Sequence, residues 1–162
     1  MKIGFLLTII SLLTGFQSMA QLKGFSVGPY AEMIWPMGRL DETNDKGIGG
    51  GINADIRIRK FGLTASAGFI HFSGKSMKVN DDMTKMPAIN AFPIRAGIKY
   101  RFIPTVYFKI EGGVARFINN SGSAVIFSPG IGLRVLGLDL QAKYETWINE
   151  GSGWGVKLGY NF

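Results

Sequence analysis

The chain has 162 residues, of which 46% are hydrophobic and 18% charged, with no cysteine and a formal net charge of +7. The apolar content is enough for a core or a lipid-facing surface, and the charge is too low for a disordered chain, so we expect one domain. The absence of cysteine excludes disulfide scaffolds, thiolate zinc sites, iron–sulfur clusters and cysteine nucleophiles.

The first 20 residues are typical of a secretory signal peptide. Lys2 supplies a positive charge, an apolar run covers residues 4–16, and Ser18-Met19-Ala20 forms a small-residue cleavage site before Gln21. The apolar run is shorter than the roughly 20 residues that a membrane-spanning helix needs. We therefore divide the chain into a cleavable signal peptide at 1–20 and one domain at 21–162.

From Phe25 onward, apolar and polar residues alternate with a period of two, which predicts β-strands. Turn residues divide the alternation into eight runs at about 24–36, 47–60, 62–74, 89–103, 106–118, 124–136, 138–149 and 153–162. The connections between the runs are long and short in turn. This order is typical of strands that cross a membrane up and down, with tight turns on one side and longer loops on the other.

One face of the predicted strands is apolar and the other is charged. A soluble barrel with its apolar face inside and a membrane barrel with its apolar face outside share this alternation. The charged faces are also rich in glycine and serine, which suits a narrow lumen because long side chains there need small neighbours. We therefore predict that the apolar face lies outside. The lumen would hold nine cations and five anions: Arg57, Arg59, Arg95, Lys99, Arg101, Lys109, Arg134, Lys143 and Lys157, with Glu32, Asp55, Glu111, Asp139 and Glu145.

Aromatic residues on the apolar face lie near both ends of the predicted strands, as expected at two membrane–water interfaces. Arg116 is the one charged residue on that face, near the loop end of its strand. Pro29 and Pro129 remove ladder hydrogen bonds, so we expect local bulges there. An even number of strands allows the first and last to pair, which leaves no open edge in the hydrocarbon.

The signal peptide, the alternating strands and the terminal Gly159-Tyr160-Asn161-Phe162 resemble the small outer-membrane β-barrels of the OmpA/OmpX type. The glycine-rich chain with few long loops is also similar to the PorT-like outer-membrane β-barrel proteins of Bacteroidota. The resemblance implies an all-β fold, an eight-stranded antiparallel up-and-down transmembrane β-barrel, in the outer membrane of a Gram-negative bacterium. Its surroundings would be outer-membrane lipid and lipopolysaccharide.

The resemblance also implies that the barrel-assembly machinery reads the last strand, through the alternating residues Trp154, Val156, Leu158, Tyr160 and Phe162. We expect a monomer, with no peptidoglycan-binding domain after the barrel. The basic residues fall on the lumen and the loops and form no basic patch with interleaved aromatics, so we expect no nucleic-acid partner.

The sharpest chemical motif is Phe69-Ile70-His71-Phe72-Ser73, which contains the one histidine. His71 and Ser73 share the lipid-facing side and resemble the active-site stretch of outer-membrane lipid A deacylases, in which such residues act on an ester. Gly74 stands where that family has asparagine, and no acid is evident on that face to orient the histidine. We therefore expect a structural or interaction protein without a catalytic site. Two alternatives stay open: this outer-leaflet enzyme, and a soluble periplasmic barrel that binds a small ligand.

The remaining motifs favour no cofactor or metal. The glycine run at 47–51 precedes an alternating strand, whereas a phosphate-binding loop opens a helix. The acidic residues at 41–45 and 81–82 lack calcium-loop spacing and fit solvated loops. An eight-stranded barrel is just wide enough for its own side chains, so paired charges are favoured over a pore. A surplus of four cations would leave room for water or a bound anion.

Overall fold

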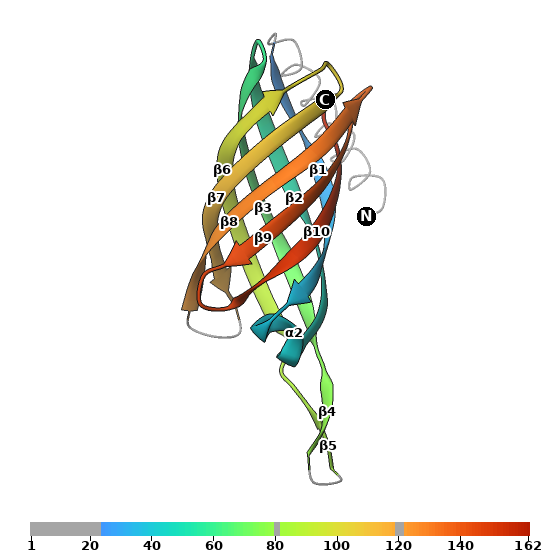
Figure 1. The fold of residues 1–162 in the computed structure, drawn as a ribbon, viewed down its shortest axis with the longest axis vertical. Coiled ribbons are helices and arrows are strands. Elements are labelled where there is room, and N and C mark those ends of the chain that lie inside the picture. Colours follow the sequence, from blue (N-terminus) through green and yellow to red (C-terminus); the bar gives the residue numbers. More distant parts are fainter. Residues whose placement is uncertain (1–23, 80–81, 119–121) are drawn as a thin grey trace, which may run out of the picture.

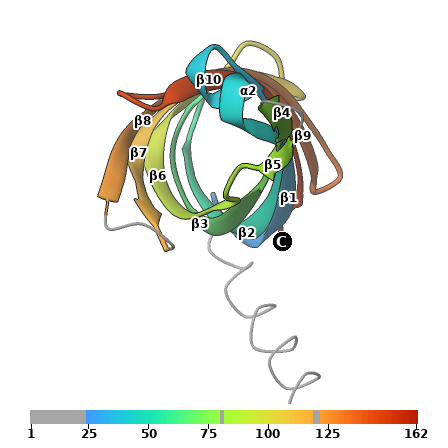
Figure 2. The ribbon, with the colours of Figure 1, turned by 90° about the horizontal axis from the view of Figure 1, so that it is seen from below.

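The computed structural model describes residues 24–79, 82–118 and 122–162. The predicted signal peptide at 1–20 lies outside these residues. Eight antiparallel strands close into a barrel in the ring order β1-β10-β9-β8-β7-β6-β3-β2 (Figures 1 and 2). They are β1 (Phe25–Met37), β2 (Asn44–Ile58), β3 (Phe61–Gly74), β6 (Ile89–Arg101), β7 (Val106–Phe117), β8 (Gly122–Val135), β9 (Leu138–Trp147) and β10 (Gly151–Tyr160).

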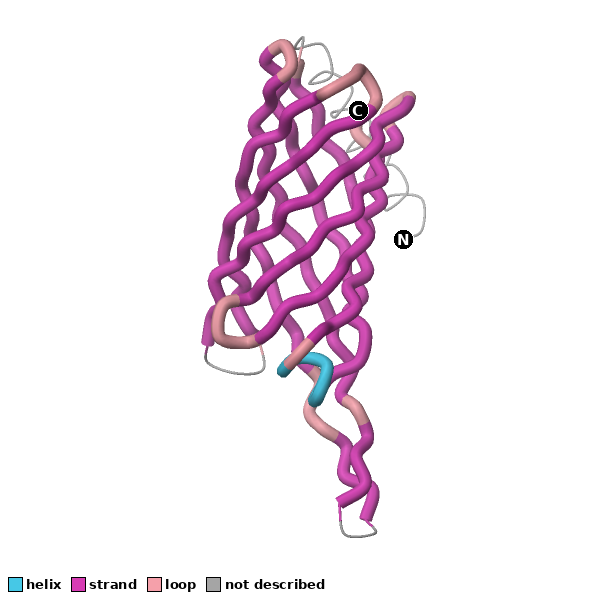
Figure 3. Tube along the Cα trace, in the orientation of Figure 1, coloured by secondary structure: helices cyan, strands magenta, loops and turns pink. Residues whose placement is uncertain are grey.

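The eight predicted strands are confirmed, with ends that differ by a few residues. Each strand pairs with its neighbours in the chain, and β1 pairs with β10 to close the ring. Three short connections, at 59–60, 102–105 and 136–137, lie at the same end as the carboxyl terminus, which we call the turn end (Figures 1 and 3). The β8–β9 turn places Leu136 and Gly137 at φ +50° and +86°. Positive φ at both central residues is what a tight hairpin with the natural strand twist requires.

Two elements at the opposite end, the loop end, were not predicted. A short helix, α2 (Arg39–Thr43), lies over the rim of the ring, with Leu40 buried (Figure 2). A separate hairpin, β4 (Ser76–Val79) and β5 (Asp82–Lys85), extends beyond the barrel (Figure 1). Among the described residues, no helix is long and apolar enough to cross a membrane.

The predicted bulges at the two prolines are wrong. Pairing of β1 with β2 runs through Pro29 without a change of register, as does pairing of β7 with β8 through Pro129. Each proline instead stands where pairing on its other side is missing: the β1–β10 ladder begins at Tyr30, and the β8–β9 ladder skips residues 128 and 129. The missing N–H groups are therefore accommodated by gaps in pairing, without an inserted residue.

The apolar faces of the strands point outward. Large exposed hydrophobic residues cover the wall of the barrel, including Leu63, Ile94, Ile98, Val114, Ile131 and Leu140. The charged faces point inward, where ten charged side chains are buried: Glu32, Asp55, Arg95, Lys99, Lys109, Glu111, Asp139, Lys143, Glu145 and Lys157. This is the arrangement of a transmembrane barrel, and it is the reverse of what an apolar ligand-binding interior requires.

Candidate functional site in the barrel interior

The loop end of the interior is filled by an apolar plug. Its members are Ile34, Leu40, Ile70, Phe72, Ala91, Ala115, Ala124, Ile126 and Trp147. The ring of Phe72 meets the indole of Trp147 edge-on, with centroids 5.6 Å apart. Leu40 comes from α2, so the helix at the rim contributes to the plug. The plug was not predicted, because alternation alone assigns one polarity to each strand face along its whole length.

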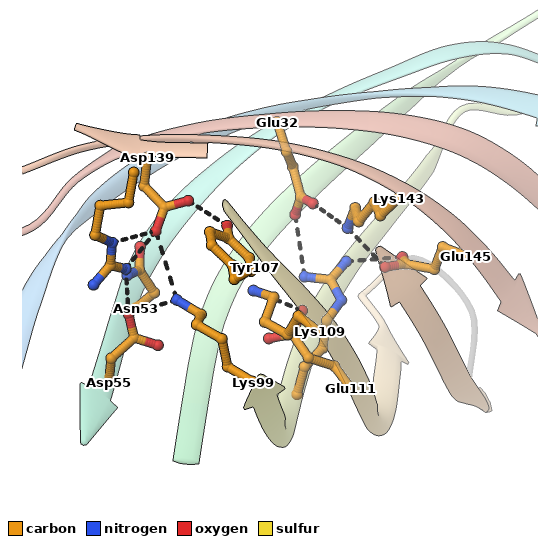
Figure 4. A network of polar contacts seen from close by, with 12 residues as sticks. Glu32, Asn53, Asp55, Lys99, Tyr107, Lys109, Glu111, Asp139, Lys143 and Glu145 are labelled. Atoms are coloured by element: carbon orange, nitrogen blue, oxygen red, sulfur yellow. Dashed lines mark hydrogen bonds and ion pairs between the residues drawn. The ribbon is translucent and has the colours of Figure 1, made fainter. Parts of the chain in front are cut away.

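On the side of the plug that faces the turn end lies a group of four buried charges, which we call the loop-side network (Figure 4). Arg95 binds Glu32 at 3.2 Å and Glu145 at 2.8 Å, and Lys143 binds the same two carboxylates at 2.6 and 2.7 Å. Two cations and two anions therefore neutralise one another. The indole N–H of Trp147 donates to Glu145 at 2.7 Å, which joins the network to the plug.

A second group of charges, the turn-side network, lies nearer the turns (Figure 4). Arg134 binds both Asp55 and Asp139, and Lys99 binds Asp55 at 2.9 Å. The hydroxyl of Tyr107 donates to Asp139. These residues come from β2, β6, β7, β8 and β9, so the network connects strands on several sides of the ring.

Between the networks, Lys109 pairs with Glu111 at 3.1 Å. The ammonium of Lys157 has no hydrogen-bond partner among the described residues and lies 3.6 Å from the centre of the Tyr30 ring, a cation–π contact. The space lined by the turn-side network and its neighbours measures only about 10 Å³, which is room for about one water molecule. The buried charges fill this part of the lumen, which supports the prediction of paired charges over a pore.

The predicted cation surplus is located outside the networks. Arg57 and Arg59 are exposed and Arg101 is half-buried, all at the turn end, so they do not fill the lumen as expected. With Lys60 and residues 102–104 they line a hollow of about 330 Å³, which we call the basic hollow. It lies between the β2–β3 and β6–β7 turns, which are joined where the backbone N–H of Arg101 donates to Lys60 at 2.8 Å.

The outer surface changes character at the loop end. On β3, the outward residue Phe69 is followed by outward His71 and Ser73, while the inward residues become apolar at Ile70 and Phe72. The inside–outside polarity of the strand is therefore reversed beyond Phe69. Polar residues are also exposed or partly exposed near the loop ends of β6, β7 and β8, at Asn90, Arg116 and Ser123.

His71 and Ser73 are both exposed on the outer surface, as predicted. Nδ1 of His71 lies 2.6 Å from the amide oxygen of Asn90, its cross-strand neighbour on β6. The group that orients the imidazole is therefore an amide, whereas a serine hydrolase triad uses a carboxylate to stabilise the imidazolium.

The acidic segment at 41–45 makes internal contacts. The Asp41 carboxylate accepts a hydrogen bond from the Lys75 ammonium at 2.7 Å, and the same ammonium reaches the Asp41 carbonyl oxygen at 2.5 Å. These contacts tie the α2 segment to the end of β3. Among the described residues, no group of three His, Cys, Asp or Glu is placed to hold a metal ion.

No family model matches the chain, and no curated protein matches it in sequence. Among solved structures, a de novo designed transmembrane β-barrel is similar with a TM-score of 0.60 and 16% identity, covering 86% of this chain and 96% of that one. The Yersinia pestis outer membrane protein Ail in a phospholipid bilayer nanodisc gives a TM-score of 0.54 at 13% identity, covering 83% and 99%.

Crystalline Ail of Yersinia pestis, in complex with the heparin analogue sucrose octasulfate, gives a TM-score of 0.51 at 17% identity, covering 86% and 97%. At these identities the likeness is one of fold. The expected fold class is confirmed: the chain is a closed eight-stranded antiparallel up-and-down β-barrel, similar to small transmembrane barrels that include outer-membrane proteins.

Proposed function

We propose that the protein is an integral outer-membrane β-barrel with a structural or interaction role and no catalytic site. One observation carries the proposal: buried charges occupy the inside of the closed barrel, and large apolar side chains cover its outside. An exposed apolar wall of this size is unfavourable in water, whereas hydrocarbon solvates it without penalty. Closure of the ring satisfies the remaining requirement, since a sheet edge cannot stand in lipid.

The reversal of polarity at the loop end supports this placement. Where outward residues are apolar, the wall faces hydrocarbon. Beyond Phe69, outward His71 and Ser73 are polar and inward Phe72 is apolar, which is the arrangement of a barrel in water. The loop end, with α2 and the β4–β5 hairpin, thus rises out of the membrane. We place it outside the cell and the turn end in the periplasm, because short turns face the periplasm in such barrels.

The proposal also covers the family, the source, the assembly signal, the surrounding lipid and the oligomeric state. The glycine-rich sequence with few long loops supports kinship with PorT-like proteins of Bacteroidota, and hence a Gram-negative source. Recognition of β10 by the barrel-assembly machinery is supported by its outward residues, which end in Tyr160 and Phe162. Lipopolysaccharide is the expected lipid around the loop end, and the closed ring supports a monomer because it leaves no strand edge to pair.

Cell fractionation and gel migration in SDS test the proposal. We expect the protein in the outer-membrane fraction, with a different migration before and after boiling, because a closed barrel resists detergent until it is heated. Recovery in the periplasm without a shift would contradict the proposal.

A matched pair of glycine variants ties the shift to closure of the ring. A Cβ on Gly28 would overlap the carbonyl oxygen of Tyr160 on the closing strand, whereas a Cβ on Gly112 has its nearest contact at 3.9 Å. We expect Gly28→Ala to lower the temperature at which the shift occurs and Gly112→Ala to leave it unchanged.

The alternative of an outer-leaflet lipid enzyme has one observation in its favour, the contact between His71 and Asn90 next to exposed Ser73. We expect Ser73→Ala to leave the mass spectrum of lipid A unchanged in cells that express the protein, because the described partner of the histidine is the Asn90 amide and not a carboxylate. A lipid A species that loses an acyl chain with the wild-type protein, but not with Ser73→Ala, would establish the enzyme instead.

A further inference from the structure

The lining of the basic hollow holds four cations and no anion. Arg57, Arg59, Lys60 and Arg101 line it, and none of the four forms an ion pair with a described carboxylate. The two aspartates nearest this end are engaged by Lys99 and Arg134 in the turn-side network. One guanidinium nitrogen of Arg101 is buried without a hydrogen-bond partner among the described residues. The hollow therefore has unused donors and uncompensated positive charge.

The turn that carries two of these cations is not built from the residues its geometry favours. Arg59 has φ +57°, a backbone region that glycine and asparagine occupy more readily. The Arg57 side chain is held in place by a hydrogen bond from its Nε to the Arg59 carbonyl at 3.3 Å. Arg59 thus stands at a backbone position that turn chemistry alone would give to glycine or asparagine, and its carbonyl fixes the Arg57 guanidinium beside the hollow.

The surroundings of the hollow indicate that its ligand is part of a lipid. Phe102 and Ile103 of the β6–β7 turn line it, and each is 54% exposed. The ring of Tyr100 lies 5.0 Å from Phe61 and 5.2 Å from Phe102, so an aromatic cluster borders the hollow on the wall side. Aromatic clusters of this kind mark the membrane–water interface, which is the depth of lipid headgroups. An acyl chain could lie along the apolar wall while its headgroup reaches the cations.

We propose that the basic hollow binds the phosphate of an anionic glycerophospholipid in the leaflet at the turn end. The site depends on the proposed membrane placement. Arg57, Arg59 and Arg101 would donate to the phosphate oxygens, since guanidinium groups bind phosphate through paired N–H donors. Lys60 adds positive charge, and Phe102 and Ile103 contact the glycerol and the first acyl carbons.

Native mass spectrometry of the refolded barrel tests the site by counting retained phosphatidylglycerol and phosphatidylcholine. We expect the wild-type protein to prefer phosphatidylglycerol by at least about tenfold, because several cations near the headgroup attract the anionic lipid. The triple variant Arg57→Gln/Arg59→Gln/Arg101→Gln should lose this preference. A matched triple, Arg39→Gln/Lys46→Gln/Arg116→Gln, removes three exposed cations from the loop end and should keep it.

Equal loss of preference in both triples would overturn the proposal, because the effect would then be one of net charge. Displacement of phosphatidylglycerol by 10-fold excess inorganic phosphate would also overturn it, because the ligand would then be free phosphate. The change in gel migration on boiling in SDS, measured for each sample, separates the proposed membrane placement from the proposed lipid site. A wild-type chain without the shift overturns the membrane placement and the lipid site together, whereas a chain with the shift but without the preference overturns the lipid site alone.

Discussion

Replacing Arg95 by methionine is expected to lower the free energy of unfolding of the barrel by about 3–5 kcal/mol, the usual cost of removing one partner from a buried ion pair. Arg95 is 1% exposed and binds two carboxylates, those of Glu32 and Glu145. Methionine fills a similar volume but leaves these two anions with Lys143 as the one cation bound to both. The loop-side network then carries one uncompensated negative charge in the interior.

A second substitution should reverse part of this loss. In Arg95→Met/Glu145→Gln the network retains Glu32 and Lys143, whose carboxylate oxygen and ammonium nitrogen lie 2.6 Å apart, so the remaining pair is neutral. The glutamine oxygen can still accept the indole N–H of Trp147. We expect the double variant to be more stable than Arg95→Met by about 0.5–3 kcal/mol, the usual range of coupling between contacting residues.

Urea unfolding of the barrel refolded in lipid vesicles, followed by tryptophan fluorescence, measures these differences. Arg116→Met is the matched control, since Arg116 is exposed on the outer surface near the loop end and its loss should change the stability by less than about 1 kcal/mol. A double variant less stable than Arg95→Met would show that the network does not act as a neutral unit of four charges.

The strands and their inward faces could be predicted from the sequence, because both follow from local pattern. A period of two assigns alternate residues to opposite faces, and glycine, proline and polar clusters mark the connections. The pairing of β1 with β10 followed from a general requirement, closure of the sheet in lipid. Neither step needs knowledge of which side chains meet across the barrel.

The partners inside the barrel could not be predicted, because they depend on how eight strands are placed around one axis. Arg95 and Glu145 lie 50 residues apart in the chain, on strands that are not neighbours in the ring. Equally, the alternation does not distinguish Arg101, which lines the basic hollow at the turn end, from Lys99, which pairs with Asp55 inside the barrel. The expected four-cation surplus was therefore assigned to the lumen, whereas the turn end holds most of it.

The apolar plug was missed for a different reason. Its inward residues Ile70 and Phe72 keep the same phase as inward Ser66 on β3, so the period shows no break. What changes is the polarity assigned to each face. A reversal of polarity along one strand can be found in the sequence when the two faces are compared segment by segment. On β3 the outward aromatic residue Phe69 marks the boundary between the two segments. The α2 helix is too short to leave a helical period, and it was assigned to a loop.

Placing an arginine in the middle of the outer wall is expected to show where the membrane lies. Ala96 is exposed on β6, midway between the outward aromatic residues Phe92 and Tyr100 of the same strand. If this band lies in hydrocarbon, Ala96→Arg should lower the free energy of unfolding by about 2–4 kcal/mol, because the charge must be moved out of water near the middle of the bilayer.

The cost should fall with depth, which separates the membrane from other sources of strain. Leu136 is 93% exposed in the β8–β9 turn, so Leu136→Arg should change the stability by less than about 1 kcal/mol. Ala96→Leu controls for the added side-chain volume at the same position. Urea unfolding in vesicles measures all three variants, and equal stability of Ala96→Arg and Leu136→Arg would place the wall in water. A cost confined to Ala96→Arg would mean that the apolar band is solvated by lipid, because a solvent-exposed position in water tolerates arginine about as readily as alanine.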